Sequence, residues 1–150
     1  MLEIILYHRT ACENSQDSLV ELIDYCYRKF LFLTNYSEKR NGRAPDDDAK
    51  KILERTPEED IMNQMEDIEF TSAISCFSLI RFITDHMQDL SVPIVHQMME
   101  MNDIPCILVP LLEMKPWFRK NKKGELEKFE DQKWVKVPPQ DMNKMPKIEA

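Results

Sequence analysis

Two long stretches of the sequence repeat apolar residues at every third or fourth position, and this spacing constrains the fold more than any other feature. The first runs from Asn14 to Thr34. Its apolar positions are Leu19, Leu22, Ile23, Cys26, Phe30 and Leu33. Side chains at this spacing lie on one face of an α-helix. We therefore predict an amphipathic helix over residues 14–34.

The second stretch begins with signals that start a helix. Thr56 suits the N-cap, Pro57 the first helical position, and Glu59 the third, where its carboxylate can complete a capping box. One apolar stripe follows Ile61, Met65, Ile68, Ser72, Cys76, Leu79, Ile83 and Met87, and a second adds Phe70, Ile74, Phe77 and Ile80. Because a helix that is apolar on two sides is buried between neighbours, we expect this to be the central helix.

Two shorter helices follow, VPIVHQMMEM and IPCILVPLLEM, separated by Asn102 and Asp103. Pro105 falls near the first turn of the second helix, where proline is tolerated, whereas Pro110 removes an internal hydrogen bond. Short paired helices with a sharp bend and an apolar last helix are typical of α-solenoid repeats. Residues 1–8 are similar to the end of a helix without its beginning, which suggests a piece of a longer chain.

Residues 116–139 have a different pattern. Leu126 and Phe129 precede a polar EDQK, and a second alternating run over residues 134–137 ends at a pair of prolines. This pattern predicts a β-hairpin near residues 125–137. Because two strands alone are barely stable, its aromatic rings are expected to anchor it on the helices. The predicted anchors are Trp117, Phe118, Phe129 and Trp134.

These patterns predict an all-α fold, an armadillo/HEAT-like α-solenoid segment with a small β-hairpin insertion. The predicted segments are a helical repeat segment at 1–34, a flexible charged loop at 35–56, armadillo-like repeats at 57–114, a basic aromatic hairpin at 115–139, and a tail at 140–150 that leads into further helices.

The charge is distributed unevenly. The chain has a formal net charge of −7, yet residues 115–136 contain eight Lys/Arg and four Asp/Glu, which leaves −11 for the rest. An acidic protein is poorly suited to nucleic acid, and the apolar runs are too short to cross a bilayer. The exposed lysines of the basic segment form either a solvated loop or a surface for an acidic protein partner. They are Lys120, Lys122, Lys123 and Lys128.

Several classes of site lack the residues that they need. Only two glycines occur, too few for the phosphate-binding loops of nucleotide-binding proteins. No GxSxG motif is present, and the cysteines are spaced as reduced core thiols (Cys12, Cys26, Cys76 and Cys106). A metal-dependent hydrolase would require His86, His96 and Glu100 to converge, and no two histidines share a helical turn. We predict a protein that is not an enzyme, with no catalytic or metal-binding residue and no cofactor in this chain.

The ten methionines leave two interpretations open. Methionine fills irregular gaps in a core, and it also forms adaptable binding surfaces. Met98 and Met99, on one short helix, are the candidates for a partner-binding surface.

Three stretches together resemble the zinc finger MYND domain-containing protein 10 family. They are CENSQDSLVELIDYCYRKFLFL, MEDIEFTSAISCFSLIRFITDHMQDLS and the segment from MNDIPCILVPLLEMKPWFRK to DQKWVKVPPQDMNKM. The resemblance implies an armadillo-type helical body. It also implies a factor for preassembly of axonemal dynein arms and assembly of motile cilia, located in the cytoplasm, at centriolar satellites or in the apical cytoplasm of ciliated cells.

The implied partners are axonemal dynein chains, an Hsp90-type chaperone with its co-chaperones, and a leucine-rich-repeat dynein assembly factor. Family members carry a MYND zinc finger built from clustered Cys and His, and no Cys follows Cys106 and no His follows His96 here. Zinc is therefore expected only in that finger and not in this chain. The predicted function is a non-enzymatic adaptor of the chaperone-cofactor type, with a generic armadillo-like scaffold unrelated to cilia as the alternative.

Overall fold

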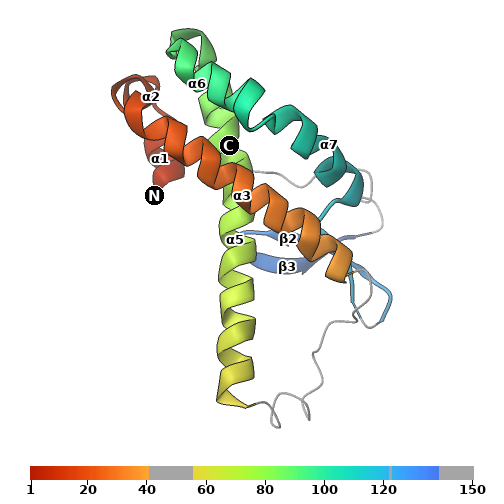
Figure 1. The fold of residues 1–150 in the computed structure, drawn as a ribbon. Helices are drawn as coiled ribbons and strands as arrows, with labels where there is room; N and C mark the ends of the chain where they lie inside the picture. The colour runs from red at the N-terminus through yellow and green to blue at the C-terminus, as the bar shows by residue number, and fades with distance from the viewer. Residues whose placement is uncertain (41–55, 122, 139–150) are drawn as a thin grey trace.

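The computed structural model describes residues 1–40, 56–121 and 123–138, and most of them are helical (Figure 1). The helices are α1 (Leu2–Leu6), α2 (Arg9–Asn14), α3 (Gln16–Arg40), α5 (Pro57–Asp85), the 3₁₀ helix η1 (Met87–Asp89), α6 (Val92–His96), the π-helical turn η2 (Gln97–Met101) and α7 (Ile104–Met114). The strands are β1 (Phe118–Lys120), β2 (Leu126–Glu130) and β3 (Lys133–Lys136). The predicted helical class is thus confirmed, together with a sheet that is larger than expected.

The first long helix continues beyond its predicted end. Helix α3 runs to Arg40 and so includes residues 35–40, which were predicted as the start of a charged loop. The segment NYSEKR contains neither glycine nor proline, the two residues that disfavour a helix most. The rest of the predicted loop, like most of the predicted tail, lies outside the described residues.

The start of α5 is the predicted capping box. The Glu59 amide donates to the Thr56 hydroxyl oxygen (3.3 Å), and the Thr56 amide donates to the Glu59 carboxylate (3.1 Å). Pro57 occupies the first helical position. Both side chains thereby satisfy backbone donors that the first turn leaves without partners.

Helix α5 is central only in its C-terminal half, which corrects the prediction that both of its apolar stripes are buried. The first three turns extend away from the other helices (Figure 1), and Ile61, Met65 and Ile68 are 58%, 63% and 66% exposed. The buried residues of α5 begin at Phe70. Periodicity showed which face of the helix is apolar, but α3 and α1 cover that face only beyond this point.

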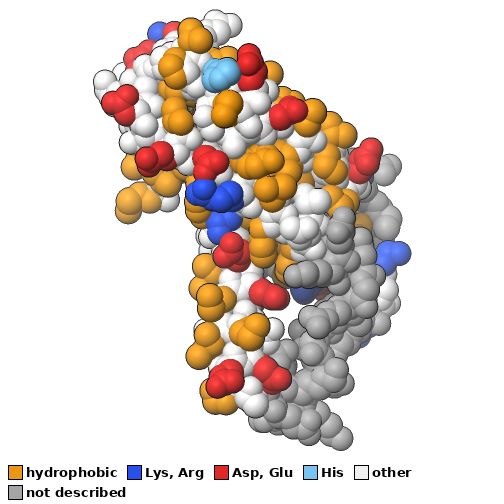
Figure 2. Space-filling view, viewed as in Figure 1, with side chains coloured by type: hydrophobic (Ala, Val, Ile, Leu, Met, Phe, Trp, Pro, Cys, Tyr) orange, Lys and Arg blue, Asp and Glu red, His pale blue; other side chains and the backbone are white. Residues whose placement is uncertain are grey.

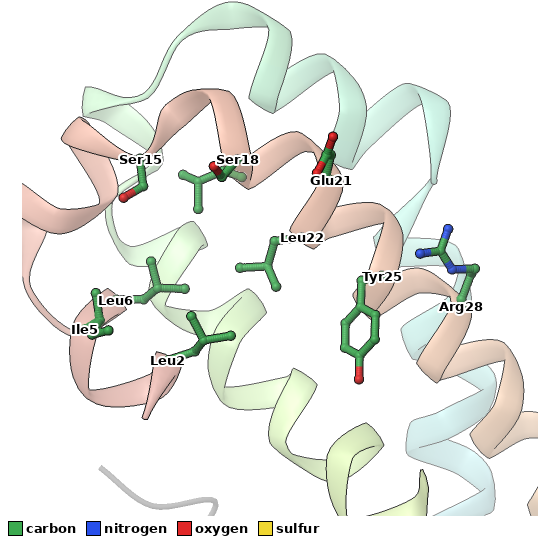
Figure 3. A pocket seen from close by; sticks show the side chains of 10 residues that line it. Leu2, Ile5, Leu6, Ser15, Ser18, Glu21, Leu22, Tyr25 and Arg28 are labelled. Atoms are coloured by element: carbon green, nitrogen blue, oxygen red, sulfur yellow. The ribbon is translucent and has the colours of Figure 1, made fainter.

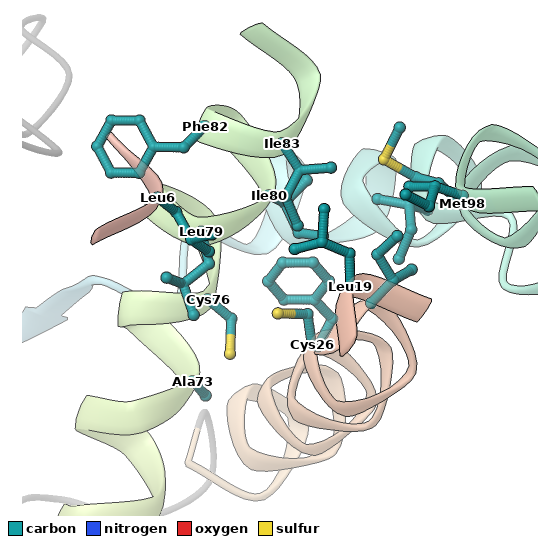
Figure 4. Close-up of a cluster of buried hydrophobic side chains, with 14 of the residues drawn as sticks. Leu6, Leu19, Cys26, Ala73, Cys76, Leu79, Ile80, Phe82, Ile83 and Met98 are labelled. Atoms are coloured by element: carbon teal, nitrogen blue, oxygen red, sulfur yellow. The ribbon is translucent and has the colours of Figure 1, made fainter. Parts of the chain in front are cut away.

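The core lies where α1, α3, α5 and the α6–α7 segment meet. Figure 4 shows side chains of α3 and α5 packed face to face, with the Cys26 and Cys76 sulfurs pointing toward one another. The fully buried residues with the largest side chains are Phe30, Leu19, Ile23, Leu33, Ile83, Ile94, Met98, Ile104 and Leu111. Five of these residues were predicted on the apolar faces of α3 and α5.

The bend between η2 and α7 falls at Asn102 and Asp103, as predicted. Asp103 adopts a left-handed conformation (φ 43°), and the buried Asn102 amide accepts from Gln97 (2.6 Å) and donates to Asp24 of α3 (3.3 Å). This polar link fixes the bend against α3, since a buried amide is stable only when it is hydrogen-bonded. Helix α7 continues through Pro110.

The three strands form one antiparallel sheet in the order β1-β2-β3. Pairing of Phe129 with Trp134 and of Lys128 with Val135 confirms the predicted hairpin. The sequence pattern missed β1, which pairs with β2 from Phe118 opposite Lys128. A third strand gives the sheet the support that an isolated hairpin lacks.

Candidate partner-binding surfaces

An open apolar groove of about 460 Å³ lies between α1 and α3 (Figure 3). Leu22 of α3 points toward Leu2 and Leu6 of α1, and the apolar lining also includes Ile5 and Leu19. The polar rim consists of Ser15, Ser18, Glu21, Tyr25 and Arg28. An apolar floor with a polar rim is the usual form of a groove that receives side chains of a partner helix.

The groove forms because α1 is short and packs against the rest of the protein on one side only. Leu6 is buried in the core, and the Tyr7 ring packs edge-on against Phe82 of α5 with centroids 5.8 Å apart. The opposite side of α1 has no such cover within the described chain, so Leu2 and Ile5 are 52% and 44% exposed. Four of the five residues of the segment LEIIL are apolar and Glu3 is the exception, which is the one sequence signal for this surface.

The rim of the groove carries charges of both signs. Arg28 pairs with Asp24 on its own helix, and Asp24 also accepts from Asn102. Glu21 also lines the groove and lies two turns before Arg28 on the same helix. A partner would therefore meet an apolar centre with one acidic and one basic group beside it.

Ion pairs within the sheet neutralise several basic side chains of the predicted basic surface. Lys128 pairs with Glu130 (2.7 Å), Lys136 pairs with Glu125 (2.7 Å), and Arg119 pairs with Glu127 (2.6 Å). The hydrogen bond from Lys136 holds the pKa of Glu125 below its usual range. These carboxylates neutralise much of the positive charge that the composition of the segment indicated.

The four lysines of the predicted surface therefore differ in availability. Lys120 and Lys123 are exposed, whereas Lys128 is largely covered and engaged by Glu130. Lys122 lies outside the described residues. Of the three lysines that the structure describes, Lys120 and Lys123 have the exposure that the prediction required.

The aromatic anchors of the hairpin were predicted largely correctly. Trp117 is buried and packs edge-on against Phe77 of α5, with centroids 5.5 Å apart. Phe129 and Trp134 pack against the core cluster of buried side chains. Phe118 is half-buried at the start of β1.

Met98 is 1% exposed and belongs to the core, so its assignment as a partner-binding residue is wrong. Its flexible side chain fills space beside α3, which is the other role considered for methionine. Met99 is 46% exposed on the same turn and remains available to a partner.

Three of the four cysteines are buried, as predicted, but Cys106 is exposed, so its prediction as a core thiol is wrong. It lies on the outward side of α7 with Val109 and Leu112, which are also exposed. A hydrogen bond with Asp103 raises the pKa of the Cys106 thiol. Cys26 and Cys76 share a hydrogen bond that, together with burial, raises the pKa of Cys26.

Two of the three histidines lie within hydrogen-bond distance of a polar partner. His86 Nε2 lies 3.4 Å from the Tyr7 carbonyl oxygen, and His96 Nδ1 lies 3.2 Å from a Glu100 carboxylate oxygen on the same helical segment. Across residues 1–40, 56–121 and 123–138, no three His, Cys, Asp or Glu side chains are grouped to hold a metal ion. None of the helices in those ranges has the length and apolarity that a bilayer crossing requires.

Comparison with known proteins identifies the family. The zinc finger MYND domain-containing protein 10 homolog of Drosophila melanogaster is 30% identical over 155 aligned residues, which include all of this chain. The chain belongs to the zinc finger MYND domain-containing protein 10 family. It spans 32% of the length of the fly protein. No family model matches the chain, and no solved structure matches it.

Proposed function

We propose that this member of the family is a non-enzymatic adaptor that acts in cytoplasmic preassembly of axonemal dynein arms. The observation that carries the proposal is the similarity to the fly homolog along the entire chain. The resemblance of its three characteristic stretches implies this role for the family. The chain would act by binding proteins, in the cytoplasm of ciliated cells, including centriolar satellites and the apical region.

The proposed partners are axonemal dynein chains, an Hsp90-type chaperone with its co-chaperones, and a leucine-rich-repeat assembly factor. The groove between α1 and α3 supports binding of a helical segment of such a partner, because it offers Leu2, Ile5 and Leu22 between polar rims. The exposed Lys120, Lys123 and Met99 are proposed as secondary contacts. Zinc is assigned to the family's MYND finger, with no role for a metal in this chain.

We also propose that the helices form a segment of an α-solenoid. The sharp bend at Asn102 between two helical segments, packed on the α3–α5 pair, supports an armadillo/HEAT-like solenoid segment. Such repeats stack on their neighbours and present long surfaces to partners. The sheet is then an insertion fastened to the solenoid through Phe70 and Phe77.

The test is capture of purified dynein chains and of the Hsp90-type chaperone by the tagged chain. Ile5→Gln in the groove is compared with Ile4→Gln, a matched change on the same helix at a residue that is 72% exposed and not part of the lining. The proposal predicts that the wild type and Ile4→Gln capture a dynein chain or the chaperone, and that Ile5→Gln captures much less.

Two results would contradict the proposal. One is that the wild type captures neither protein. The other is that Ile5→Gln captures as much of either protein as Ile4→Gln does, which would show that the groove is not the binding surface.

A further inference from the structure

The first three turns of α5 carry an exposed apolar stripe. Ile61, Met62, Met65 and Ile68 are 58%, 65%, 63% and 66% exposed, and Figure 2 shows apolar side chains along one edge of this part of the helix. Exposed apolar residues are common singly, but a row of large ones on a single helix face marks an interaction site.

The stripe continues the face that the rest of α5 buries. Counting in steps of three and four from Met65 leads through Ser72 to Cys76, Leu79 and Ile83, the last three of which are buried against the core. The same helix face is therefore covered by α3 and α1 at one end and by no described residue at the other. A helix laid along the stripe would extend an existing helix–helix interface.

Among the residues that the structure describes, the charges carried by this part of α5 are all negative. Residues 57–80 contain no lysine or arginine, and five exposed carboxylates lie in the first three turns of α5. They are Glu58, Glu59, Asp60, Glu66 and Asp67. Glu69, at the end of this region, pairs with Lys29 of α3 (2.6 Å).

We propose that this acidic, apolar stripe binds an amphipathic helix whose apolar face is flanked by lysine or arginine. The apolar row fits residues spaced by three and four on the partner, and the carboxylates fit its basic flanks. A second copy of this chain fits poorly, because pairing two such stripes brings like charges together. An anionic membrane surface is repelled for the same reason.

This inference rests on the proposed function and deepens it, since it states the chemistry of a second partner segment. It concerns a surface on the N-terminal half of α5, separate from the α1–α3 groove. The stripe is tested with synthetic peptides, whereas the proposed function is tested by capture of dynein chains and the chaperone. A negative result in one experiment therefore does not decide the outcome of the other.

The experiment measures binding of fluorescent helical peptides to the 150-residue chain by anisotropy. One peptide has a leucine face flanked by lysine, a second has the same face flanked by glutamate, and a third has the lysine peptide's composition in scrambled order. Met62→Gln/Met65→Gln makes two of the four stripe residues polar without changing the charge. Val109→Gln/Leu112→Gln is the control, because these α7 residues are also apolar and 57% and 48% exposed.

The proposal predicts that the lysine-flanked peptide binds and that the other two bind at least tenfold more weakly. The stripe variant should lose at least tenfold in affinity, and the α7 variant should match the wild type. Ile61→Gln, a single change at the exposed start of the helix, should weaken binding in the same direction. Circular dichroism melting of each variant verifies that it is folded.

The inference is overturned if the lysine-flanked peptide binds the wild type no better than the scrambled one. It is also overturned if the stripe variant retains full affinity or if the glutamate-flanked peptide binds equally well. The wild type and the Met62→Gln/Met65→Gln variant are also compared by sedimentation. A dimeric wild type and a monomeric variant would show that a second copy of the chain occupies the stripe instead.

Discussion

Phe70 of α5 stacks on Trp134 of β3, with ring centroids 5.6 Å apart and an angle of 27° between the ring planes. The same Phe70 ring lies 5.0 Å from Phe129 of β2 and 5.1 Å from Tyr36 of α3. One buried ring therefore joins the two long helices to the sheet. The Arg119 guanidinium lies over the Trp134 ring, 4.4 Å from the ring centroid.

Replacement of Phe70 by alanine should destabilise the whole fold. Loss of a buried phenylalanine costs ~3–5 kcal/mol, from lost burial and from the cavity that remains. Urea unfolding followed by tryptophan fluorescence measures the free energy of unfolding. Phe118→Ala, at a half-buried position, should cost clearly less. An equal decrease in the free energy of unfolding for the two variants would show that Phe70 is not the main anchor of the sheet.

One thiol of the native chain should react before the other three. Cys106 is exposed, whereas Cys12, Cys26 and Cys76 are buried. A maleimide assay should therefore modify a single cysteine before unfolding, and Cys106→Ser should abolish this fast phase. Because hydrogen bonding to Asp103 raises the pKa of Cys106, the rate should be low near neutral pH and rise steeply with pH. Rapid modification of two or more thiols would contradict the burial of the other three.

Glycine should be more favourable than the native glutamine at position 132, in the turn between β2 and β3. Asp131 and Gln132 both have positive φ (49° and 61°), the conformation of a two-residue hairpin turn that favours Asn-Gly or Asp-Gly. Gln132→Gly should therefore stabilise the fold by ~0.5–1 kcal/mol, because glycine adopts this φ without a Cβ clash. Thermal melting should show a higher Tm for Gln132→Gly and no gain for Gln132→Ala. A lower Tm for the glycine variant would contradict the turn geometry.

Glu125 should titrate below the usual range for glutamate. Hydrogen bonds from Lys136 and Asn121 hold its pKa down in the folded chain. A depressed pKa means that this interaction is present above the unfolded pKa and is lost as the pH falls through the folded value. Lys136→Gln should return the Glu125 pKa toward its ordinary range, as followed by carboxyl NMR, and Asn121→Ala should shift it less. An unchanged Glu125 pKa in Lys136→Gln would rule out the pairing.

The sequence predicted local features well because each depends on residues that are close in the chain. The Thr56–Glu59 capping box, the apolar face of α3 and the pairing of Phe129 with Trp134 are of this kind. Strand β1 was missed because three residues, Phe118–Lys120, are too few for alternation to be recognised.

The misassigned residues depend on neighbours from distant segments. Met98 is buried because α3 lies over it, and Cys106 is exposed because the α7 face that carries it has no cover within the described chain. Lys128 is paired because β2 places Glu130 on the same side of the sheet. The α1–α3 groove likewise requires two segments to meet, so composition and periodicity could not reveal it.

The most direct test of the central claim is methyl NMR of the labelled chain while a captured dynein chain or chaperone is added. Binding through the α1–α3 groove should shift or broaden the Leu2, Ile5 and Leu22 methyl signals first, and should leave Ile4 nearly unchanged. A complex that forms while the three groove signals remain unperturbed would show that the partner binds elsewhere and would contradict the account.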